Sequence, residues 1–384
     1  MEGTRKIAMI FTRCLFVENR QTGGIKRFIE LSKYLSNTDD DFHIFSSDNS
    51  DVISENGIRN HERLKKTRSV FKALPPEAGM VLSNLSLFKR IKHSGYDDII
   101  IFDVPTAIGP ILCGLKKVVL MIRKDMIGYE KVQNRSKTKW IKIGYQWVCE
   151  SICMLRAKLI ITQCNYDKDV LKGRHPILAK CIEKKTIIQI NNVNPSWIVS
   201  KSEKIATSEI KLGETNKFRV CFIGGFGNPR KGQDLFLCTA QQVLKIDQGY
   251  EFIMIGGGGG LEDYKNKYES DGIIFMGRQD NPIGILKQCE LLVVPSYADS
   301  CPNTVMEALY NGVPVIGSRA GGIPEILNDE TALFDLSSNS LLKSILKLKE
   351  DEEALIRLKE QQKIRKKELE FEWAQRIMEI IKKN

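Results

Sequence analysis

The sequence predicts an α/β protein made of two doubly wound parallel sheets. Its 384 residues are enough for about two domains. Short apolar runs alternate along the chain with amphipathic patterns, which is the order of elements in a parallel sheet with crossover helices. Most of the apolar runs are continuous, as expected of strands that helices cover on both faces.

In the first half, apolar runs predict strands and amphipathic segments predict helices. The strands are Ile7–Phe11, Phe42–Phe45, Asp98–Phe102, Lys117–Ile122, Leu159–Thr162 and Thr186–Ile190. The helices are Ile25–Ser36, Ser83–His93 and Trp140–Arg156. Pro75 and Pro76 break any helix that starts near Arg68.

In the second half the same alternation is cleaner. The strands are Arg219–Ile223, Glu251–Ile255, Ile273–Met276, Leu291–Pro295, Pro314–Gly317 and Ala332–Phe334. The helices are Gln233–Lys245, Leu261–Tyr268, Pro282–Cys289, Asn303–Asn311, Ile323–Leu327 and Ser340–Leu348. The stretch Asp351–Lys383 is charged and helical.

The segment Asn191–Lys217 has few strong signals and suggests a linker. We expect an N-terminal domain over 1–195, a linker over 196–217 and a C-terminal domain over 218–365. We expect residues 366–384 to form a helix that packs back on the N-terminal domain. Two such sheets would face each other across a cleft at the carboxyl ends of their strands, where ligands bind.

The charge is concentrated in the first half. The chain carries a net +11, with +13 in residues 1–200 and −2 in the remainder. A basic half indicates an anionic partner, such as a membrane surface or a phosphorylated acceptor. Nucleic acid is not expected, because no recognised binding module is present. No apolar run approaches the ~20 residues of a membrane span, and no signal peptide is visible, which predicts a cytoplasmic protein.

The cysteines and histidines predict neither disulfides nor a metal site. Ten cysteines lie mostly in apolar stretches, without a Cys-x-x-Cys. The four histidines are scattered, and no Cys/His cluster has zinc spacing. We therefore expect reduced thiols and no metal or other cofactor.

A glycine-rich loop follows the predicted strand Arg219–Ile223. Gly224, Gly225 and Gly227 would let the backbone approach an anion. Arg230 and Lys231 would neutralise a diphosphate; the alternative is an ordinary loop with solvated charges. The loop is neither a Walker motif nor a dinucleotide fingerprint. Five further glycines, Gly256–Gly260, suit either a nucleotide contact or a turn.

The segment Val294–Ile326 is the most specific. Asp299 precedes a predicted helix that begins near Asn303 and carries Glu307. Two carboxylates suit hydrogen bonds to sugar hydroxyls, and the amides of Ser300–Thr304 suit phosphate. Gly312 is predicted to cap the helix in the left-handed conformation, and a Gly-Gly pair follows the next strand.

This segment resembles the retaining nucleotide-sugar glycosyltransferases of family 4, also called glycosyl transferases group 1, which have the GT-B fold. Asp299 and Glu307 match the family's acid-x7-acid spacing, and Arg230–Gly232 match its Arg-Lys-Gly. Gly23 and Gly24 match a loop that touches the donor phosphate or the acceptor. The C-terminal match is highly specific, whereas the N-terminal match is loose.

The resemblance implies transfer of a hexose or N-acetylhexosamine from a UDP- or GDP-linked donor to a saccharide or lipid-linked saccharide, with retention and without a metal. Polysaccharide or lipopolysaccharide biosynthesis would be the setting, with the N-terminal domain holding the acceptor. The implied catalytic residues are Asp299, Glu307, Arg230 and Lys231. The implied donor-binding residues are Gly23, Gly24, Gly225, Arg230, Lys231, Asp299, Cys301, Asn303, Thr304 and Glu307.

The chain departs from the family pattern at three places. Gly225 stands where many members have Arg, and Arg230 is expected to take over part of that role. Ser300-Cys301-Pro302 replaces a Gly-Phe-Gly. Arg123 begins the segment where many members have His, and would contact donor or acceptor. Glu325 is either a further polar contact or part of a helix surface.

Two questions stay open at this level. The stretch Lys137–Lys158 combines lysines with Trp140, Tyr145 and Trp147, which suits a membrane interface or a core-facing helix. We expect peripheral association with the inner face of the membrane. The alternatives to an active transferase are a catalytically degenerate GT-B protein that acts as a membrane or assembly partner, and a nucleotide-sugar epimerase. Retention of both acids and both cations disfavours the first, and the lack of further cleft acids and histidines disfavours the second.

Overall fold

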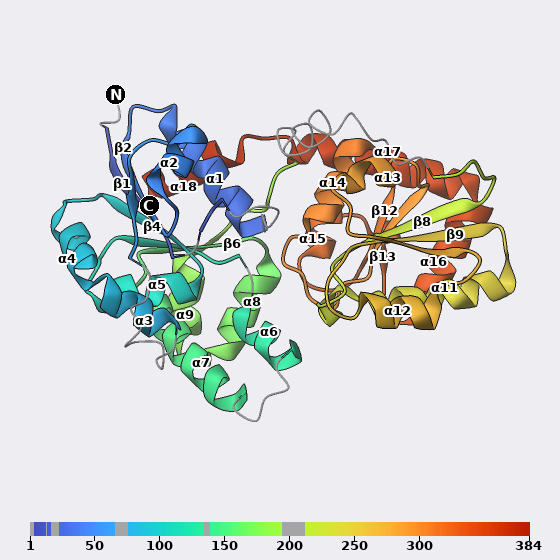
Figure 1. The fold of residues 1–384 in the computed structure, drawn as a ribbon, viewed down its shortest axis with the longest axis horizontal. Coiled ribbons are helices and arrows are strands. Elements are labelled where there is room, and N and C mark those ends of the chain that lie inside the picture. Colours follow the sequence, from blue (N-terminus) through green and yellow to red (C-terminus); the bar gives the residue numbers. More distant parts are fainter. Residues whose placement is uncertain are drawn as a thin grey trace. The chain divides into compact units, whose positions relative to one another are not determined.

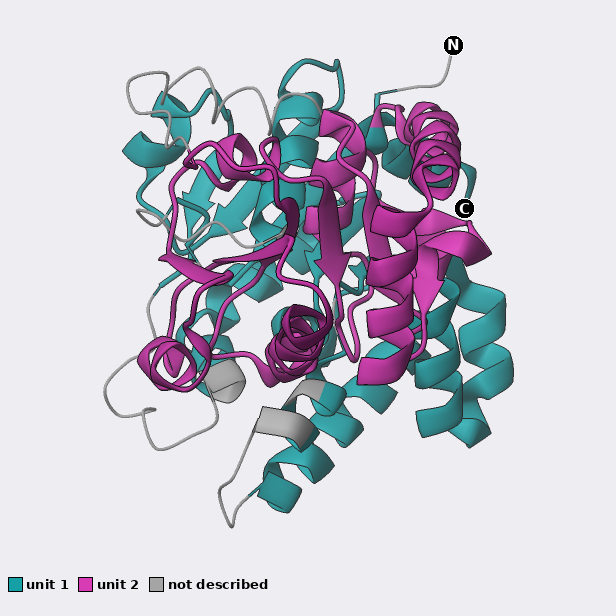
Figure 2. Cartoon of the chain, turned by 90° about the vertical axis from the view of Figure 1, so that its right-hand side faces the viewer, with its two compact units in different colours: residues 1–189, 373–384 teal, residues 190–372 magenta. Residues whose placement is uncertain are grey.

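The computed structural model describes residues 4–12, 14–16, 23–65, 76–123, 125–133, 139–193 and 212–384. The chain divides into two compact units (Figure 2). Unit 1 holds Met1–Gln189 and Trp373–Asn384, and unit 2 holds Ile190–Glu372. Most of the expected linker, 196–211, lies outside the described residues.

Unit 1 is built on a seven-stranded parallel sheet in the order β3-β2-β1-β4-β5-β6-β7 (Figure 1). Its strands are β1 (Lys6–Phe11), β2 (Asp41–Ser46), β3 (His61–Arg63), β4 (Asp98–Phe102), β5 (Val118–Met121), β6 (Leu159–Thr162) and β7 (Thr186–Ile188). Its helices are α1 (Gly23–Ser36), α2 (Ser50–Glu55), α3 (Pro76–Ser83), α4 (Leu85–His93), α5 (Val104–Leu112), α6 (Met126–Gln133), α7 (Lys139–Arg156), α8 (Asn165–Arg174), the 3₁₀ turn η2 (Pro176–Leu178), α9 (Ala179–Lys185) and the C-terminal α18 (Trp373–Lys383).

Unit 2 is built on a six-stranded parallel sheet in the order β10-β9-β8-β11-β12-β13. Its strands are β8 (Phe218–Ile223), β9 (Tyr250–Ile255), β10 (Ile273–Gly277), β11 (Leu291–Val294), β12 (Val315–Ser318) and β13 (Leu333–Phe334). Its helices are the 3₁₀ turn η3 (Pro229–Lys231), α11 (Gln233–Ile246), α12 (Leu261–Tyr268), α13 (Pro282–Leu286), α14 (Asn303–Asn311), α15 (Ile323–Leu327), the 3₁₀ turn η4 (Glu330–Ala332), α16 (Ser338–Glu350) and α17 (Glu352–Leu369).

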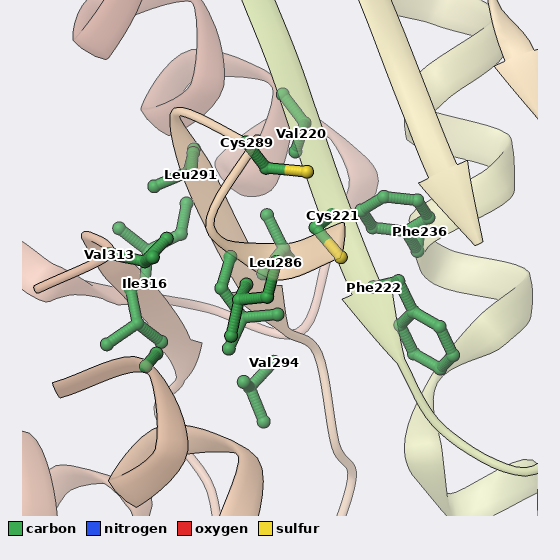
Figure 3. Packing of buried hydrophobic residues seen from close by; sticks show 14 of the residues in the cluster. Val220, Cys221, Phe222, Phe236, Leu286, Cys289, Leu291, Val294, Val313 and Ile316 are labelled. Carbon is green, nitrogen blue, oxygen red and sulfur yellow. The ribbon is translucent and has the colours of Figure 1, made fainter. Parts of the chain in front are cut away.

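The continuous apolar runs form the core of each sheet, as predicted. Figure 3 shows how side chains of unit 2 pack around β8, where Cys221 and Phe222 meet Phe236 of α11 and Leu286 of α13. Each is at most 2% exposed. Burying such an apolar side chain contributes roughly 1.5–3 kcal/mol, so this layer fixes β8 and thereby the loop that leaves its carboxyl end.

Several elements of unit 1 differ from the sequence prediction. The predicted helix Ser83–His93 is wrong at its start, because Ser83 ends α3 and α4 begins at Leu85. Between them the Asn84 side chain bonds the backbone of Lys65 in both directions, which turns the chain. The helix α5 was missed because its side chains are buried nearly all round, so no amphipathic period marks it. The edge strand β3 was missed because it is short and polar.

The charged C-terminal stretch forms two helices that belong to different units. α17 stays with unit 2, where the Gln362 side chain donates to and accepts from the Val315 backbone of β12 at 2.6 and 2.9 Å. α18 belongs to unit 1, where Arg5 donates to the carbonyl of Lys382 at 2.9 Å. The chain passes from unit 2 back to unit 1 at Trp373, whereas the sequence analysis expected this at residue 366. The reason is that α17 continues to Leu369.

Candidate functional site

The candidate site of unit 2 lies at the point of its sheet where the strand order reverses. β8 and β11 are neighbours, yet the chain continues from β8 to β9 on one side and from β11 to β12 on the other. The connections that follow β8 and β11 therefore lead to opposite sides of this strand pair, and ligands bind in the crevices of parallel sheets at such points. Arg230 and Lys231 follow β8, and Asp299 follows β11.

The loop after β8 is held by its own polar groups. The Asn228 side chain accepts a hydrogen bond from the Arg230 amide at 3.3 Å, which starts the turn η3. The buried Gln233 side chain donates to the carbonyls of Gly225 and Asn228 at 2.6 and 3.0 Å. Gly232 has φ +79°, and a Cβ there would lie 2.0 Å from the Pro295 carbonyl oxygen. The backbones of the two loops therefore touch, and only glycine fits at that contact.

Lys231 and Asp299 join the two sequence motifs. The Lys231 Nζ lies 2.5 Å from Asp299 Oδ2, and the two side chains are 28% and 21% exposed. The Tyr297 amide donates to the Arg230 carbonyl at 2.8 Å. Residues 68 positions apart are thus brought into one polar site that remains open to solvent, where both groups can exchange their mutual contact for a ligand.

A second glycine pair positions the Asp299 backbone. The Gly322 amide donates to the Asp299 carbonyl at 2.9 Å. Gly321 has φ +61°, and a Cβ there would lie 2.3 Å from that same carbonyl oxygen. The Gly-Gly pair after β12 therefore fits the closely approaching loop after β11, which is the physical reason for glycine at this position.

Helix α14 presents three predicted donor-binding side chains on one face. Val305, Met306, Ala308 and Leu309 are buried against the core. Asn303, Thr304 and Glu307 are half-buried on the other side, because residues three and four apart share a helix face. Gly312 ends the helix with φ +69° as a left-handed cap, which confirms that prediction.

The five-glycine segment packs against the loop after β8. The Phe226 amide donates to the Gly257 carbonyl at 3.0 Å. A Cβ on Gly256, whose φ is +155°, would lie 1.9 Å from the Gly224 carbonyl oxygen. The glycines of both loops therefore serve close approach of one backbone to another. The sequence had left a turn and a nucleotide contact open, and this packing of two loops was not among the alternatives.

The remaining predicted residues of unit 2 lie in different surroundings. Gly225 is exposed, with ordinary space where a side chain would be. Cys301 is buried in the hydrophobic core, so its side chain serves packing and only its backbone could face a donor. Glu325 lies in the short helix α15, where its carbonyl accepts a hydrogen bond from Arg365 at 2.7 Å.

In unit 1, Gly23 and Gly24 are the first residues of α1, and Arg123 follows β5. The Arg123 guanidinium lies 5.6 Å from the ring centroid of Trp373, and the guanidinium of Arg27 lies 5.0 Å from the same ring. Arg27 and Trp373 are fully buried. The sequence analysis missed both, although a Trp that opens an amphipathic C-terminal helix is a signal for a docking anchor.

A buried ionic network was also missed. Arg174 donates to both carboxylate oxygens of Glu150 at 2.9 and 2.8 Å and to Asp125 at 2.5 Å. The His175 ring lies 2.7 Å from Glu150 and 3.1 Å from Ser151. Because its members come from the β5–α6 loop, α7 and the end of α8, no local spacing in the sequence could have shown it.

Two absences can be stated for the residues that the structure describes. In those ranges no helix is both long and apolar enough to cross a bilayer. The same residues contain no group of three or more His, Cys, Asp or Glu placed to hold a metal ion.

Comparison with known proteins assigns the segment that carries the site. Residues 217–351 match the family described as glycosyl transferases group 1. A segment of 126 residues is 32% identical to N-acetyl-alpha-D-glucosaminyl L-malate synthase of Bacillus anthracis, and covers 31% of this chain and 32% of that protein. A longer segment of 274 residues is 24% identical to UDP-Gal:alpha-D-GlcNAc-diphosphoundecaprenol alpha-1,3-galactosyltransferase of Escherichia coli, and covers 67% of each. The chain thus matches about a third of the first relative's length and about two thirds of the second's.

Solved structures extend the likeness over almost the whole fold. Anabaena HepE, solved with UDP and glucose, aligns with a TM-score of 0.69 at 16% identity over 99% of this chain and all of that one. Sucrose-phosphate synthase of Thermosynechococcus elongatus aligns with a TM-score of 0.73 at 16% identity, covering 99% and 98%. At such identities the likeness establishes the fold alone. Residues 217–351 thus match the glycosyl transferases of group 1, and the chain as a whole has the GT-B fold.

Proposed function

We propose that the chain is a retaining glycosyltransferase that moves a hexose or N-acetylhexosamine from a UDP- or GDP-linked donor to a saccharide or lipid-linked saccharide. The observation that carries this is the Lys231–Asp299 contact, which joins the cationic loop after β8 to the acidic loop after β11 at the switch point of the sheet. The activity of the Escherichia coli relative, a transfer to a sugar linked to diphosphoundecaprenol, supports the acceptor class.

The two cations would stabilise the leaving group. Breaking the anomeric bond places negative charge on the departing nucleotide diphosphate, and fixed cations stabilise such charge strongly in a partly enclosed site. Lys231 is already aimed at the switch point by Asp299. Arg230 lies in the same turn and adds a second cation next to it in the sequence. We assign both to the diphosphate, with Lys231 as the principal group.

The two acids would orient the donor. When a diphosphate takes over Lys231, Asp299 is released to accept hydrogen bonds from hydroxyls of the donor sugar. Glu307 shares its helix face with Asn303 and Thr304, near the amino end of α14, and would accept from the ribose hydroxyls. The backbone amides at that end suit a phosphate.

No protein nucleophile is required in this mechanism. The bond to the acceptor oxygen would form on the same face of the sugar from which the diphosphate leaves. The departing phosphate oxygen would take the acceptor's proton, so the configuration is retained and charge is balanced. Because Lys231, Arg230 and helix amides carry the phosphate charge, we propose that transfer persists in excess EDTA.

The acceptor would be held by unit 1, whose residues supply most of the excess positive charge. A lipid-linked saccharide places the reaction at a membrane, and we propose peripheral association with an anionic membrane surface. Polysaccharide or lipopolysaccharide assembly is the corresponding setting.

The test is nucleotide release with UDP- and GDP-sugars, followed by product analysis. We expect one donor to support transfer with retained configuration, and Lys231→Ala to abolish most of it. Lys349→Ala is the matched control, because Lys349 makes a comparable 2.5 Å contact with Asp247 in the same unit. Donor binding without any transfer to saccharide or lipid-linked acceptors would favour the degenerate, partner-type alternative.

A further inference from the structure

One exposed stripe of α7 carries no charge. Trp140, Ile141, Trp147, Val148 and Leu155 are between 43% and 76% exposed. They repeat at intervals of seven residues, so they form one stripe along the 18-residue helix, with Gly144 and Ser151 between them. An exposed helix face normally carries charged side chains, so the apolar stripe needs a partner.

The opposite face of α7 is already occupied within unit 1. Ile143, Cys149, Cys153 and Met154 are buried, and α7 packs against α5, α6 and α9. Figure 1 shows α7 at the lower edge of unit 1, beside α6 and α9. The stripe is therefore the face of α7 that the described elements of unit 1 leave uncovered.

The stripe continues onto the neighbouring turn η2. Ile177 in that turn is 95% exposed, and η2 packs against α7. The Trp147 ring lies 5.1 Å from the His175 ring, and its Nε1 donates to the Arg174 carbonyl at 3.1 Å. Since its polar atom is satisfied inside the protein, the exposed part of Trp147 is purely apolar.

Cations stand at both ends of the stripe. Lys139 lies 5.5 Å from the ring centroid of Trp140, and Lys185 donates to the Leu155 carbonyl at the end of α7. Arg156 is exposed beside it. From α7 to α9, residues 139–185 carry ten Lys/Arg and four Asp/Glu.

The acidic residues near the stripe are already paired. Glu150 is buried against Arg174, and Glu183 is bound by Lys168 and Lys172. Glu130 of the adjacent α6 pairs with Lys142. The surroundings of the stripe are therefore net cationic, with their carboxylates neutralised.

We propose that the α7 stripe, comprising Trp140, Ile141, Trp147, Val148, Leu155 and Ile177, inserts into the headgroup region of an anionic lipid bilayer. An apolar stripe with interfacial tryptophans and flanking cations fits this surface chemistry. This proposal deepens the proposed function. Only the role of the contact rests on that function: the enzyme would be held at the membrane that carries its acceptor.

Insertion differs from the purely electrostatic association that the net charge suggests. Salt screens charges beyond about 8 Å at physiological ionic strength, so electrostatic binding is released by salt. Burial of apolar side chains is not screened. The stripe therefore predicts a part of vesicle binding that persists in 0.5 M NaCl.

The test is co-sedimentation of the full chain with vesicles of phosphatidylcholine and phosphatidylglycerol, at about 0.05 and 0.5 M NaCl. We expect the triple variant Ile141→Gln, Val148→Gln, Leu155→Gln to lose roughly tenfold or more of the partition coefficient at high salt. The matched control, Ile246→Gln with Ile364→Gln, removes comparably exposed apolar side chains from unit 2 and should bind as the wild type does. Lys139→Gln with Lys185→Gln should lower binding at low salt only.

Tryptophan fluorescence gives a second readout that needs no donor or acceptor. We expect a blue shift on adding vesicles, and quenching by lipids brominated on their acyl chains. Unchanged high-salt binding in a triple variant with wild-type circular dichroism would overturn the proposal. The proposal would also be overturned if the wild type were a dimer and the triple substitution only made it a monomer. A second copy of the chain would then be what covers the stripe. The triple variant should transfer sugar to a water-soluble acceptor as fast as the wild type does. If the wild type itself shows no transfer, the proposed function is wrong, but the membrane proposal is still tested by vesicle binding.

Discussion

The two units share one architecture but position their chemistry differently. In each, the first strand of the unit pairs with the strand at which the chain reverses direction, β1 with β4 and β8 with β11. In unit 2 the loops beyond β8 and β11 touch backbone to backbone at Gly232, and the loop beyond β12 touches the loop beyond β11 at Gly321. In unit 1 the corresponding edge is joined by side chains, such as Thr12 and Thr106 at 3.1 Å.

This difference explains why the candidate site of unit 2 could be predicted from the sequence. Close approach of two backbones permits only glycine, so the sites of unit 2 leave a fixed pattern of glycines and polar residues. Side-chain contacts such as those around Trp373 tolerate many sequences and leave no pattern. Unit 2 is thus recognised by its motifs, whereas unit 1 is recognised by its fold.

The largest effect should come from the anchor of unit 1. Trp373→Ala removes a fully buried side chain and the ring against which two guanidinium groups lie, which should cost about 3–5 kcal/mol of unfolding free energy. Hydrogen exchange should accelerate across β1, β4 and β5 but not across β8–β13. Trp373→Phe should retain most of the stability. Equal acceleration in both units would show that their stabilities are not separable.

The next effect concerns the proposed diphosphate contact of unit 2. Lys231→Ala should lower kcat about 100-fold, the loss typical of one preorganised group that stabilises developing negative charge. Arg230→Ala should cost less, and the double variant should be the weakest. Lys349→Ala should keep the wild-type rate. A wild-type affinity for nucleoside diphosphate in both single variants would assign this loop a structural role only.

A smaller effect is expected at the face of α14 that we propose binds the donor. Glu307→Ala removes hydrogen bonds to a charged acceptor worth about 1.5–3 kcal/mol, so kcat/KM for the donor should fall roughly tenfold or more. The fold should persist, because Glu307 lies outside the buried side of the helix. Glu360, an exposed acid of α17, provides the control Glu360→Ala. An unchanged rate at limiting donor would remove Glu307 from the site.

The smallest effect is a pH dependence confined to unit 1. Burial is the main cause that lowers the pKa of His61 below its ordinary value, with Ser46 and Ser50 at 2.9 and 3.0 Å from its ring nitrogens. The unfolded state therefore binds the proton more readily. The folded state has its full stability with respect to His61 above about pH 6.5, where the ring is neutral in both states. It loses stability as the pH falls from there through the lowered pKa.

Urea unfolding at pH 7.5 and 5.5 measures this effect. The wild type should lose more stability between the two pH values than His61→Gln does. An equal loss in both proteins would mean that His61 does not contribute to the pH dependence. Unit 2 contains no histidine, so its own hydrogen exchange should not report this titration.

The sequence by itself determined the parallel α/β class, nearly all strands, and the residues on either side of the switch point of unit 2. Continuous apolar runs and glycine-dependent turns are local features, and local physics suffices for them. Tertiary structure alone decided the Lys231–Asp299 contact, the placement of Trp373 against Arg27 and Arg123, and the burial of Cys301. It also decided which face of α7 stays exposed, because helical spacing defines a stripe but only the packing of α5, α6 and α9 selects the side that is covered.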